Sequence, residues 1–155
     1  MGLKNYTTSI PVEKTIAEIE MILALHGVSD IWKQYDGAGN ITGVNFIVST
    51  EFGKMPFRLP MNAQAVSQVL KNQKEAGQLG SLPWKQADDI NHARKVGWRI
   101  LKDWIDSQMA IIDLELVKIE QVFLPYAYDP NTDSTLYDKL VERKFKGMLM
   151  EAKEE

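Results

Sequence analysis

Apolar residues recur at helical spacing near the start of the chain. They follow one another at intervals of three and four and are Val12, Ile16, Ile19, Leu23 and, closing the stripe, His26. This spacing predicts an amphipathic helix over residues 11–26, with Pro11 in its first turn and Gly27 at its end. The residues before it, Lys4–Ile10, are polar and rich in β-prone side chains. A short strand is therefore expected to lead into the helix.

The middle third changes to a period of two. Val44, Phe46 and Val48 alternate with more polar neighbours, and so do Met55, Phe57 and Leu59. The alternation predicts three strands, Ser29–Tyr35, Ile41–Thr50 and Met55–Leu59, separated by turn-forming segments at 36–40 and 51–54. Such short connections favour an antiparallel meander. Pro56 cannot donate a ladder hydrogen bond, so the last strand is expected at an edge, or bulged there.

The chain becomes helical after Pro60. One helix is predicted over Ala63–Glu75, and Ser81 is placed to cap a longer one running to Asp113. Unbroken from 82 to 113, that helix would span roughly 48 Å, whereas a compact chain of this length has a radius of gyration of about 15 Å. Either it breaks, near Asn91 or Gly97, or it projects and is covered by a second copy in a homodimer.

The last forty residues predict two further helices. Lys118–Leu124 is a short helix stopped by Pro125, and Thr135 with Asp138 forms a capping box for a final helix whose apolar face continues to Leu149. Residues 151–155 are expected to be a frayed tail. The prediction is a single α+β domain over residues 1–150, with an N-terminal strand and helix, a three-stranded antiparallel meander and a C-terminal helical half.

Composition narrows the possible functions. The 155 residues include 18 Lys and Arg, 21 Asp and Glu and no Cys, for a formal net charge of −3. Without cysteine there is no disulfide framework, thiol nucleophile or Cys-ligated metal. No apolar run is long enough for a signal peptide or a membrane span, so we expect a cytoplasmic location and no membrane partner. Since no global basic field exists, nucleic acid would have to be bound by a local patch.

Two places interleave cations with aromatic residues, as proteins that bind single-stranded nucleic acid do. Lys33 and Tyr35 share one face of a predicted strand, with Arg58 expected nearby, and Arg99 and Lys102 lie on the long helix between two tryptophans. The commoner interpretation is a solvated surface. On the helix, Arg99–Asp103 and Lys102–Asp106 would cancel at i, i+4, and the outer face of a meander is polar in any case.

Candidates for metal or nucleophilic chemistry are weak. Asp88, Asp89 and His92 share a helix face and could hold a divalent cation, but no second ligand cluster accompanies them, and both acids suit a helix start. His26 is expected to be structural, close to the last carbonyls of its helix. The glycines at 37 and 39 indicate a hairpin turn rather than a phosphate loop. No serine has a nucleophile-elbow sequence, so neither an enzyme nor a cofactor is indicated.

Several short motifs carry a resemblance to known sequences. They are Tyr6-Thr7-Thr8 with Pro11-Val12, Phe57-Arg58-Leu59-Pro60, the segment from Trp98 to Trp104, and Val122-Phe123-Leu124-Pro125-Tyr126. With these motifs the chain resembles a family of short uncharacterised proteins encoded by bacteriophages and prophages. The resemblance implies a setting inside a bacterial host cell, where such accessory proteins act on DNA metabolism or on host defence. It provides no catalytic residues.

The sequence therefore leaves three functional hypotheses. The first is a non-enzymatic accessory protein of DNA replication or recombination that binds single-stranded nucleic acid through Lys33, Tyr35, Arg58, Arg99 and Lys102. The second is a protein-binding module that inhibits or recruits a host defence protein, through an acidic face or through the sheet edge at Met55–Leu59. The third and weakest is a metal-dependent nuclease at Asp88, Asp89 and His92.

Overall fold

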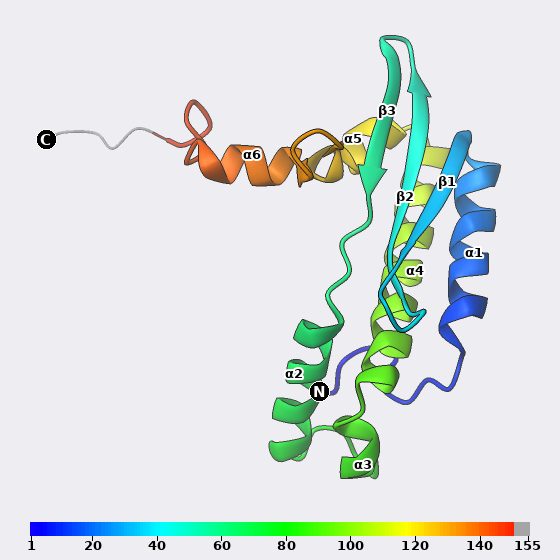
Figure 1. The fold of residues 1–155 in the computed structure, drawn as a ribbon, viewed down its shortest axis with the longest axis vertical. Helices are drawn as coiled ribbons and strands as arrows, with labels where there is room; N and C mark the ends of the chain where they lie inside the picture. Colours follow the sequence, from blue (N-terminus) through cyan, green and yellow to red (C-terminus); the bar gives the residue numbers. More distant parts are fainter. Residues whose placement is uncertain (151–155) are drawn as a thin grey trace, which may run out of the picture. The chain divides into compact units, whose positions relative to one another are not determined.

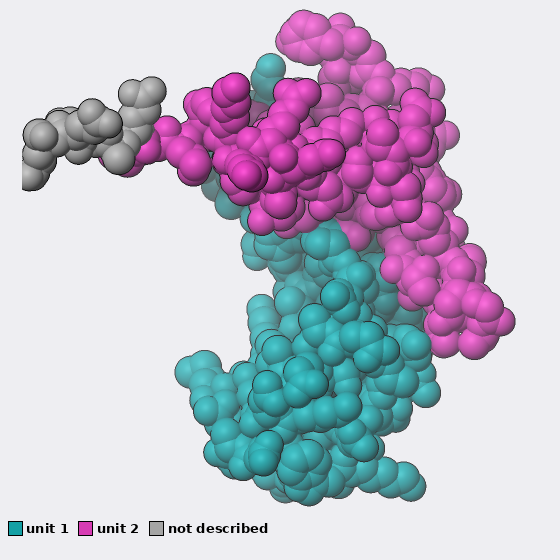
Figure 2. Space-filling view, turned by 60° about the vertical axis from the view of Figure 1, so that its left-hand side comes forward, with its two compact units in different colours: residues 1–28, 60–118 teal, residues 29–59, 119–155 magenta. Residues whose placement is uncertain are grey.

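The computed structural model describes residues 1–150 and has the predicted α+β architecture (Figure 1). The chain divides into two compact units, each built from two segments (Figure 2). Residues 1–28 and 60–118 form unit 1, and residues 29–59 and 119–155 form unit 2. A single domain over residues 1–150 stays a prediction, and the tail expected at 151–155 lies outside the described residues. None of the helices described is long and apolar enough to cross a bilayer.

Unit 1 is helical. It contains α1 (Val12–Leu25), α2 (Ala63–Glu75), the single turn α3 (Trp84–Ala87) and α4 (Ile90–Asp113). Both α1 and α2 pack against α4, and α2 also contacts α3. One group of buried side chains, Leu70, Leu79, Leu82, Ala87, Ala93 and Val96, fills the space between α2, α3 and α4. The predicted helices over 11–26 and 63–75 are thus confirmed within a residue, because their apolar periodicity and end signals agree.

The segment before α1 does not form the predicted strand. The Tyr6 amide donates to the Leu3 carbonyl at 3.2 Å and the Thr8 amide donates to the Asn5 carbonyl at 3.0 Å, which makes two consecutive turns. Asn5 adopts a left-handed φ of 64°. Side chains of unit 1 satisfy this backbone where a strand partner was expected. Gln73 Oε1 accepts from the Leu3 amide at 2.7 Å, and the Tyr6 carbonyl lies 2.6 Å from His92 Nε2.

The long helical segment breaks close to Asn91, one of the two expected places, and not at Gly97. The break lies at Asp88 and Asp89, where the Asp89 carboxylate accepts from the Asn91 amide at 2.9 Å and caps α4. Gly97 instead lies inside a continuous helix. A Cβ added there would come within 2.5 Å of the Met61 methyl carbon and 3.2 Å of Val66 Cγ2. Glycine at this position therefore serves a close approach between segments rather than a helix break.

Unit 2 contains the predicted meander. Its strands β1 (Val28–Tyr35), β2 (Ile41–Thr50) and β3 (Gly53–Arg58) lie in the order β1-β2-β3. In the β1–β2 turn, Asp36 Oδ1 accepts from the amides of Ala38 and Asn40, both at 2.9 Å. Gly39 supplies the positive φ that this turn needs, at 83°. The strands match the prediction because turn chemistry and alternation fix them locally.

The C-terminal part of unit 2 covers part of the β3 edge. It consists of α5 (Ile119–Val122), a 3₁₀ turn η1 (Leu124–Tyr126), a small hairpin of β4 (Tyr128–Asp129) and β5 (Ser134–Thr135), and α6 (Leu136–Glu142). As expected, β3 is a terminal strand of the three-stranded sheet, with Pro56 opposite Ile47. Phe57, however, forms a β-bridge with Ala127. The edge at Met55–Leu59 is therefore partly occupied by the chain itself, which weakens it as a docking edge.

Three phenylalanines form the core of unit 2. Phe46 and Phe57 are cross-strand partners whose rings are stacked, with their centroids 5.3 Å apart. The Phe123 ring packs edge-on against the Phe46 ring, with the centroids 5.2 Å apart. All three are fully buried. The side chain of Phe123 thereby fixes the second segment of unit 2 to the first.

The final helix has the predicted start but not the predicted end. Thr135 and Asp138 form a reciprocal capping box. The helix stops at Glu142, because Lys144 and Phe145 both adopt a φ of 55°. The turned chain places the Phe145 ring 5.9 Å from the Tyr137 ring. A local aromatic contact thus replaces the helical face expected to continue to Leu149.

Candidate functional site

The residues predicted to bind nucleic acid belong to two different units. Lys33 and Tyr35 lie on β1 and Arg58 on β3, with β2 between them. Arg99 and Lys102 belong to α4 in the other unit. Tyr35 is 57% exposed, and Lys33 is exposed too while also having an interaction within the chain. Within unit 2, therefore, Lys33 and Tyr35 are neighbours, whereas Arg58 is two strands away.

Arg58 holds the small β4–β5 hairpin against the sheet. Its Cζ lies 3.9 Å from the centroid of the Tyr128 ring, and its Nη1 lies 3.1 Å from Asp133 Oδ1. Its Nε donates a hydrogen bond to Asn45 Oδ1 at 3.3 Å. The Tyr128 hydroxyl also donates to Asp133. This hydrogen bond and the Arg58 charge lower the pKa of Asp133, and the same bond raises the pKa of Tyr128. The Arg58 charge is therefore already balanced.

Asn45 shows that the second face of the sheet is not simply polar and wet. It occupies one of the positions expected to face solvent, yet it is fully buried and opposes Arg58 across the β2–β3 pair. Its Nδ2 has no hydrogen-bond partner in the described part of the chain. The expectation of an open polar face was wrong here: Asn45 is buried and accepts a hydrogen bond from Arg58, which is itself held by Tyr128 and Asp133.

The cations of α4 are also paired with carboxylates. Lys102 binds Asp106 at 2.6 Å, as the i, i+4 spacing predicts. Arg99, whose side chain is only 14% exposed, pairs with Glu18 of α1 instead of with Asp103. Asp103 binds Asn5 Nδ2 at 2.9 Å and the Lys4 ammonium at 3.3 Å. Although partial burial opposes it, these two partners lower the pKa of Asp103. The charges of Arg99 and Lys102 are therefore balanced as expected, but Arg99 is largely buried and pairs across to α1, so the predicted solvated Arg99–Asp103 pair does not form.

The three metal candidates have separate structural roles. Asp89 caps α4, Asp88 lies 3.3 Å from the Lys71 ammonium, and buried His92 contacts the Tyr6 carbonyl and Gln86 through its two ring nitrogens. Among residues 1–150, no group of three or more histidine and carboxylate side chains could hold a metal ion. These residues therefore do not assemble the site that the nuclease hypothesis requires.

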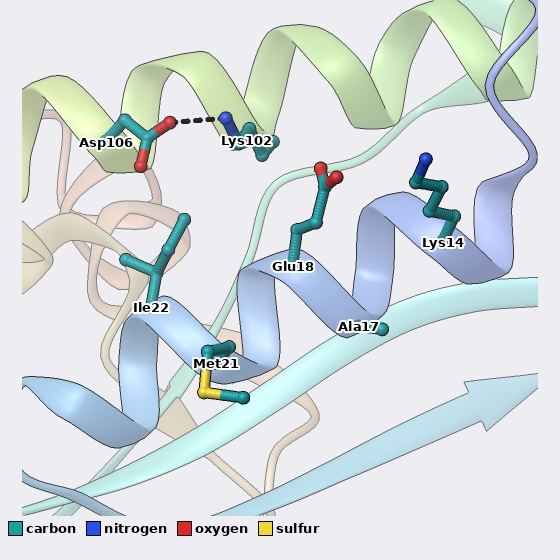
Figure 3. Close-up of a pocket in the computed structure, with 7 residues that line it drawn as sticks. All are labelled: Lys14, Ala17, Glu18, Met21, Ile22, Lys102 and Asp106. Carbon is teal, nitrogen blue, oxygen red and sulfur yellow. Dashed lines mark ion pairs between the residues drawn. The ribbon is translucent and has the colours of Figure 1, made fainter.

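A groove between α1 and α4 was not anticipated from the sequence. It has a volume of about 520 Å³ and is lined by Lys14, Ala17, Glu18, Met21, Ile22, Lys102 and Asp106. Figure 3 shows Glu18 and Ile22 pointing from α1 toward Lys102 and Asp106 of α4. Three of its lining residues take part in ion pairs, Glu18 with Arg99 and Lys102 with Asp106. Lys14 at the rim has no partner in the part of the chain that the structure describes. We call this feature the α1–α4 groove.

A second surface missed by the sequence is the C-terminal segment, residues 136–150. From Leu124 to Met150 not one residue is buried. The large apolar side chains that the segment exposes are Tyr137, Val141, Met148, Leu149 and Met150. Arg143, Lys144 and Lys146 lie among them, and none of the three has a carboxylate partner within residues 1–150. In the sequence, the signal for such a surface was a run at 143–150 that has three cations and no acidic residue. The prediction instead extended the apolar face of the last helix to Leu149.

Comparison with known proteins gives no relative: no family model, no curated protein and no solved structure matches the chain.

Proposed function

We propose that the chain is a non-enzymatic accessory protein that binds another protein through the C-terminal segment, residues 136–150. The observation that carries this proposal is a folded helix with no fully buried side chain. α6 has seven residues and no buried side chain. Helices shorter than about 12–15 residues are marginal in water unless tertiary packing supports them. A partner that covers the apolar side of α6 supplies that packing.

The chemistry of the segment favours a protein partner over nucleic acid. Interfaces with nucleic acid are polar and strongly cationic, whereas this segment exposes five large apolar side chains beside three cations. Full burial of one such aliphatic or aromatic side chain contributes about 1.5–3 kcal/mol. The three unpaired cations select a partner with carboxylates around an apolar patch. An acidic protein surface with an apolar centre is the complementary partner.

Binding of single-stranded nucleic acid, the first hypothesis from the sequence, has less support. Three of its five residues, Arg58, Arg99 and Lys102, are held in ion pairs with carboxylates. Neutralising a phosphate would require breaking each of these pairs. The resemblance to short phage proteins makes a bacterial protein the first partner to seek.

The test is capture from a bacterial lysate by the immobilised full-length protein and by two surface variants. Leu149 and Leu116 are exposed to nearly the same degree, 69% and 70%. Leu149→Glu should abolish capture of a stoichiometric partner, while Leu116→Glu, the matched control, should retain it. The purified pair should then bind more weakly as salt is raised, and less steeply so when Arg143, Lys144 and Lys146 are replaced by alanine.

Two outcomes would contradict the proposal. One is capture that is equal for wild type and Leu149→Glu. The other is tight binding of labelled single-stranded DNA at physiological salt, measured by fluorescence anisotropy, that is lost in Arg99→Glu. The second result would favour the nucleic-acid hypothesis instead.

A further inference from the structure

The β2–β3 hairpin presents an aromatic residue at its tip. Phe52 is 91% exposed, and among the large hydrophobic side chains of residues 1–150 only Met1 and Met150 are more exposed. Its backbone is nonetheless ordered. Thr50 Oγ1 accepts from the Phe52 amide at 3.1 Å and donates to the Gly53 carbonyl at 2.8 Å. Phe52 is therefore held outward on a rigid turn.

Turn chemistry does not explain this phenylalanine. Two-residue hairpin turns favour Asn-Gly or Asp-Gly, because their central residues adopt positive φ. The two residues between the paired positions Thr50 and Gly53 are Glu51 and Phe52, and neither has a positive φ. Where a sequence departs from the local rule, a functional site is the usual reason. A rigid exposed aromatic also loses little conformational entropy on binding, as interface hot spots require.

We propose that Phe52 inserts into the α1–α4 groove of a second copy of this chain. The groove volume of about 520 Å³ is ample for a phenylalanine side chain, and its walls offer Ala17, Met21 and Ile22. Met21 is 61% exposed. A methionine side chain adapts readily to an incoming aromatic ring and makes favourable sulfur–aromatic contacts. The two surfaces are thus complementary in size and polarity.

The charges beside the two surfaces are opposite, which favours a second copy of this chain as the partner. Glu51 precedes Phe52 at the tip, and Lys14 lies at the rim of the groove. Within residues 1–150 neither charge has an ionic partner. With Phe52 of one copy in the groove of the other, the Glu51 carboxylate reaches the Lys14 ammonium. The contact joins two different surfaces of the same chain, so two copies that exchange it reciprocally form a two-fold dimer, whereas one-way contacts form a longer chain.

Sedimentation equilibrium of the full chain over a concentration series up to high micromolar tests this association. The wild type should associate reversibly. Phe52→Ser should weaken association by roughly 30-fold or more, the loss typical of an aromatic hot spot. Trp84→Ser, which removes an aromatic residue exposed by 52% elsewhere, should leave association unchanged. Ala17→Arg fills the groove at an exposed position of α1 and should weaken association as Phe52→Ser does.

Two combinations of variants test the assigned contacts directly. An equimolar mixture of Phe52→Ser and Ala17→Arg should associate more tightly than either variant alone, because one intact tip meets one intact groove. Lys14→Glu and Glu51→Lys should each weaken association, and the double charge swap should restore it. A wild type that stays monomeric at every concentration overturns the proposal. Association that persists in Phe52→Ser, or that is lost in Trp84→Ser, overturns it equally.

Discussion

His26 shows how a single side chain links the ends of two helices. Its Nδ1 lies 2.8 Å from the Ile22 carbonyl in the last turn of α1, and its Nε2 lies 3.1 Å from the carboxylate of Asp113 at the end of α4. Only the imidazolium has an N–H to donate to both. The backbone hydrogen bond to Ile22 and the Asp113 carboxylate accordingly raise the pKa of His26, against the opposing effect of burial. The structural role expected from the sequence is confirmed.

The raised pKa predicts a pH-dependent contribution to stability. A group whose folded pKa exceeds its unfolded value of about 6.5 stabilises the fold fully below that value, and this is lost as pH rises through the folded pKa. The free energy of unfolding should therefore fall on His26→Gln by about 0.3–1 kcal/mol in acid, the range for a cation at a helix C-terminus. Above the folded pKa the difference should shrink.

Urea unfolding of wild type and His26→Gln across this pH range checks the prediction. Using the difference between the two proteins cancels the titration of every other group. A difference that stays constant with pH would mean that the imidazole makes only neutral contacts.

At the scale of elements, the boundaries that sequence predicts well are those set by neighbouring residues. The Thr135–Asp138 capping box, the Asn62 cap of α2 and the Asp36 turn each satisfy backbone groups within four residues. The break between α3 and α4 is also local, and it lies close to Asn91, one of the two places predicted for it, rather than at Gly97. The Asp89 carboxylate accepts a hydrogen bond from the Asn91 amide, so Asp89 is the N-cap and α4 begins at Ile90.

The position of the break predicts unequal effects of two adjacent aspartates. Asp89→Ala should destabilise the protein by about 0.5–2 kcal/mol, since it removes a helix cap, and Asp89→Ser should keep most of the stability. Asp88→Ala, the matched control, loses only an exposed ion pair to Lys71 and should cost less than about 1 kcal/mol. Thermal unfolding followed by circular dichroism compares the three. Equal losses for the two alanine variants would place the start of the helix elsewhere.

At the scale of the whole molecule, each unit is assembled from segments far apart in the sequence. The chain leaves unit 1 after residue 28, returns at 60 and leaves again after 118. Unit 2 therefore needs its second segment, which begins at residue 119, to complete its core, and Phe123 is the residue that supplies it. The centroid of the Phe123 ring lies 5.2 Å from that of Phe46 and 6.2 Å from that of Phe57. Stability of the sheet should depend on a side chain more than sixty residues away.

Phe123→Ala should accordingly destabilise unit 2 more than unit 1. A buried phenylalanine replaced by alanine costs about 3–5 kcal/mol, and leucine, which fills most of the volume, should cost less. Hydrogen exchange resolved by peptide should accelerate in β2 and β3 more than in α1 and α2. Uniform acceleration along the chain would show instead that the two units unfold together.

The sequence by itself determined the α+β class, the first helix, the three strands and the charge of the chain, because periodicity, caps and turns act between near neighbours. It also anticipated the Lys102–Asp106 pair, one helical turn apart. Only the tertiary structure decided that Arg99 pairs with Glu18, eighty-one residues away, and that Arg58 meets Tyr128 and Asp133. These partners come from elements that spacing cannot relate, and they neutralise the cations on which the nucleic-acid hypothesis depends.

The surfaces left exposed were also settled by tertiary structure. The apolar residues of the C-terminal segment have the composition of a buried face, yet Tyr137 and Val141 in α6 are exposed, as are Met148, Leu149 and Met150 after the left-handed turn at Lys144 and Phe145. Ala17 and Met21 lie off the main stripe of α1 and become a groove wall only because α4 packs beside them. Burying a given apolar side chain yields about the same free energy whether it is buried in the core or against a partner. What decides whether it becomes core or binding surface is the packing of segments distant along the chain.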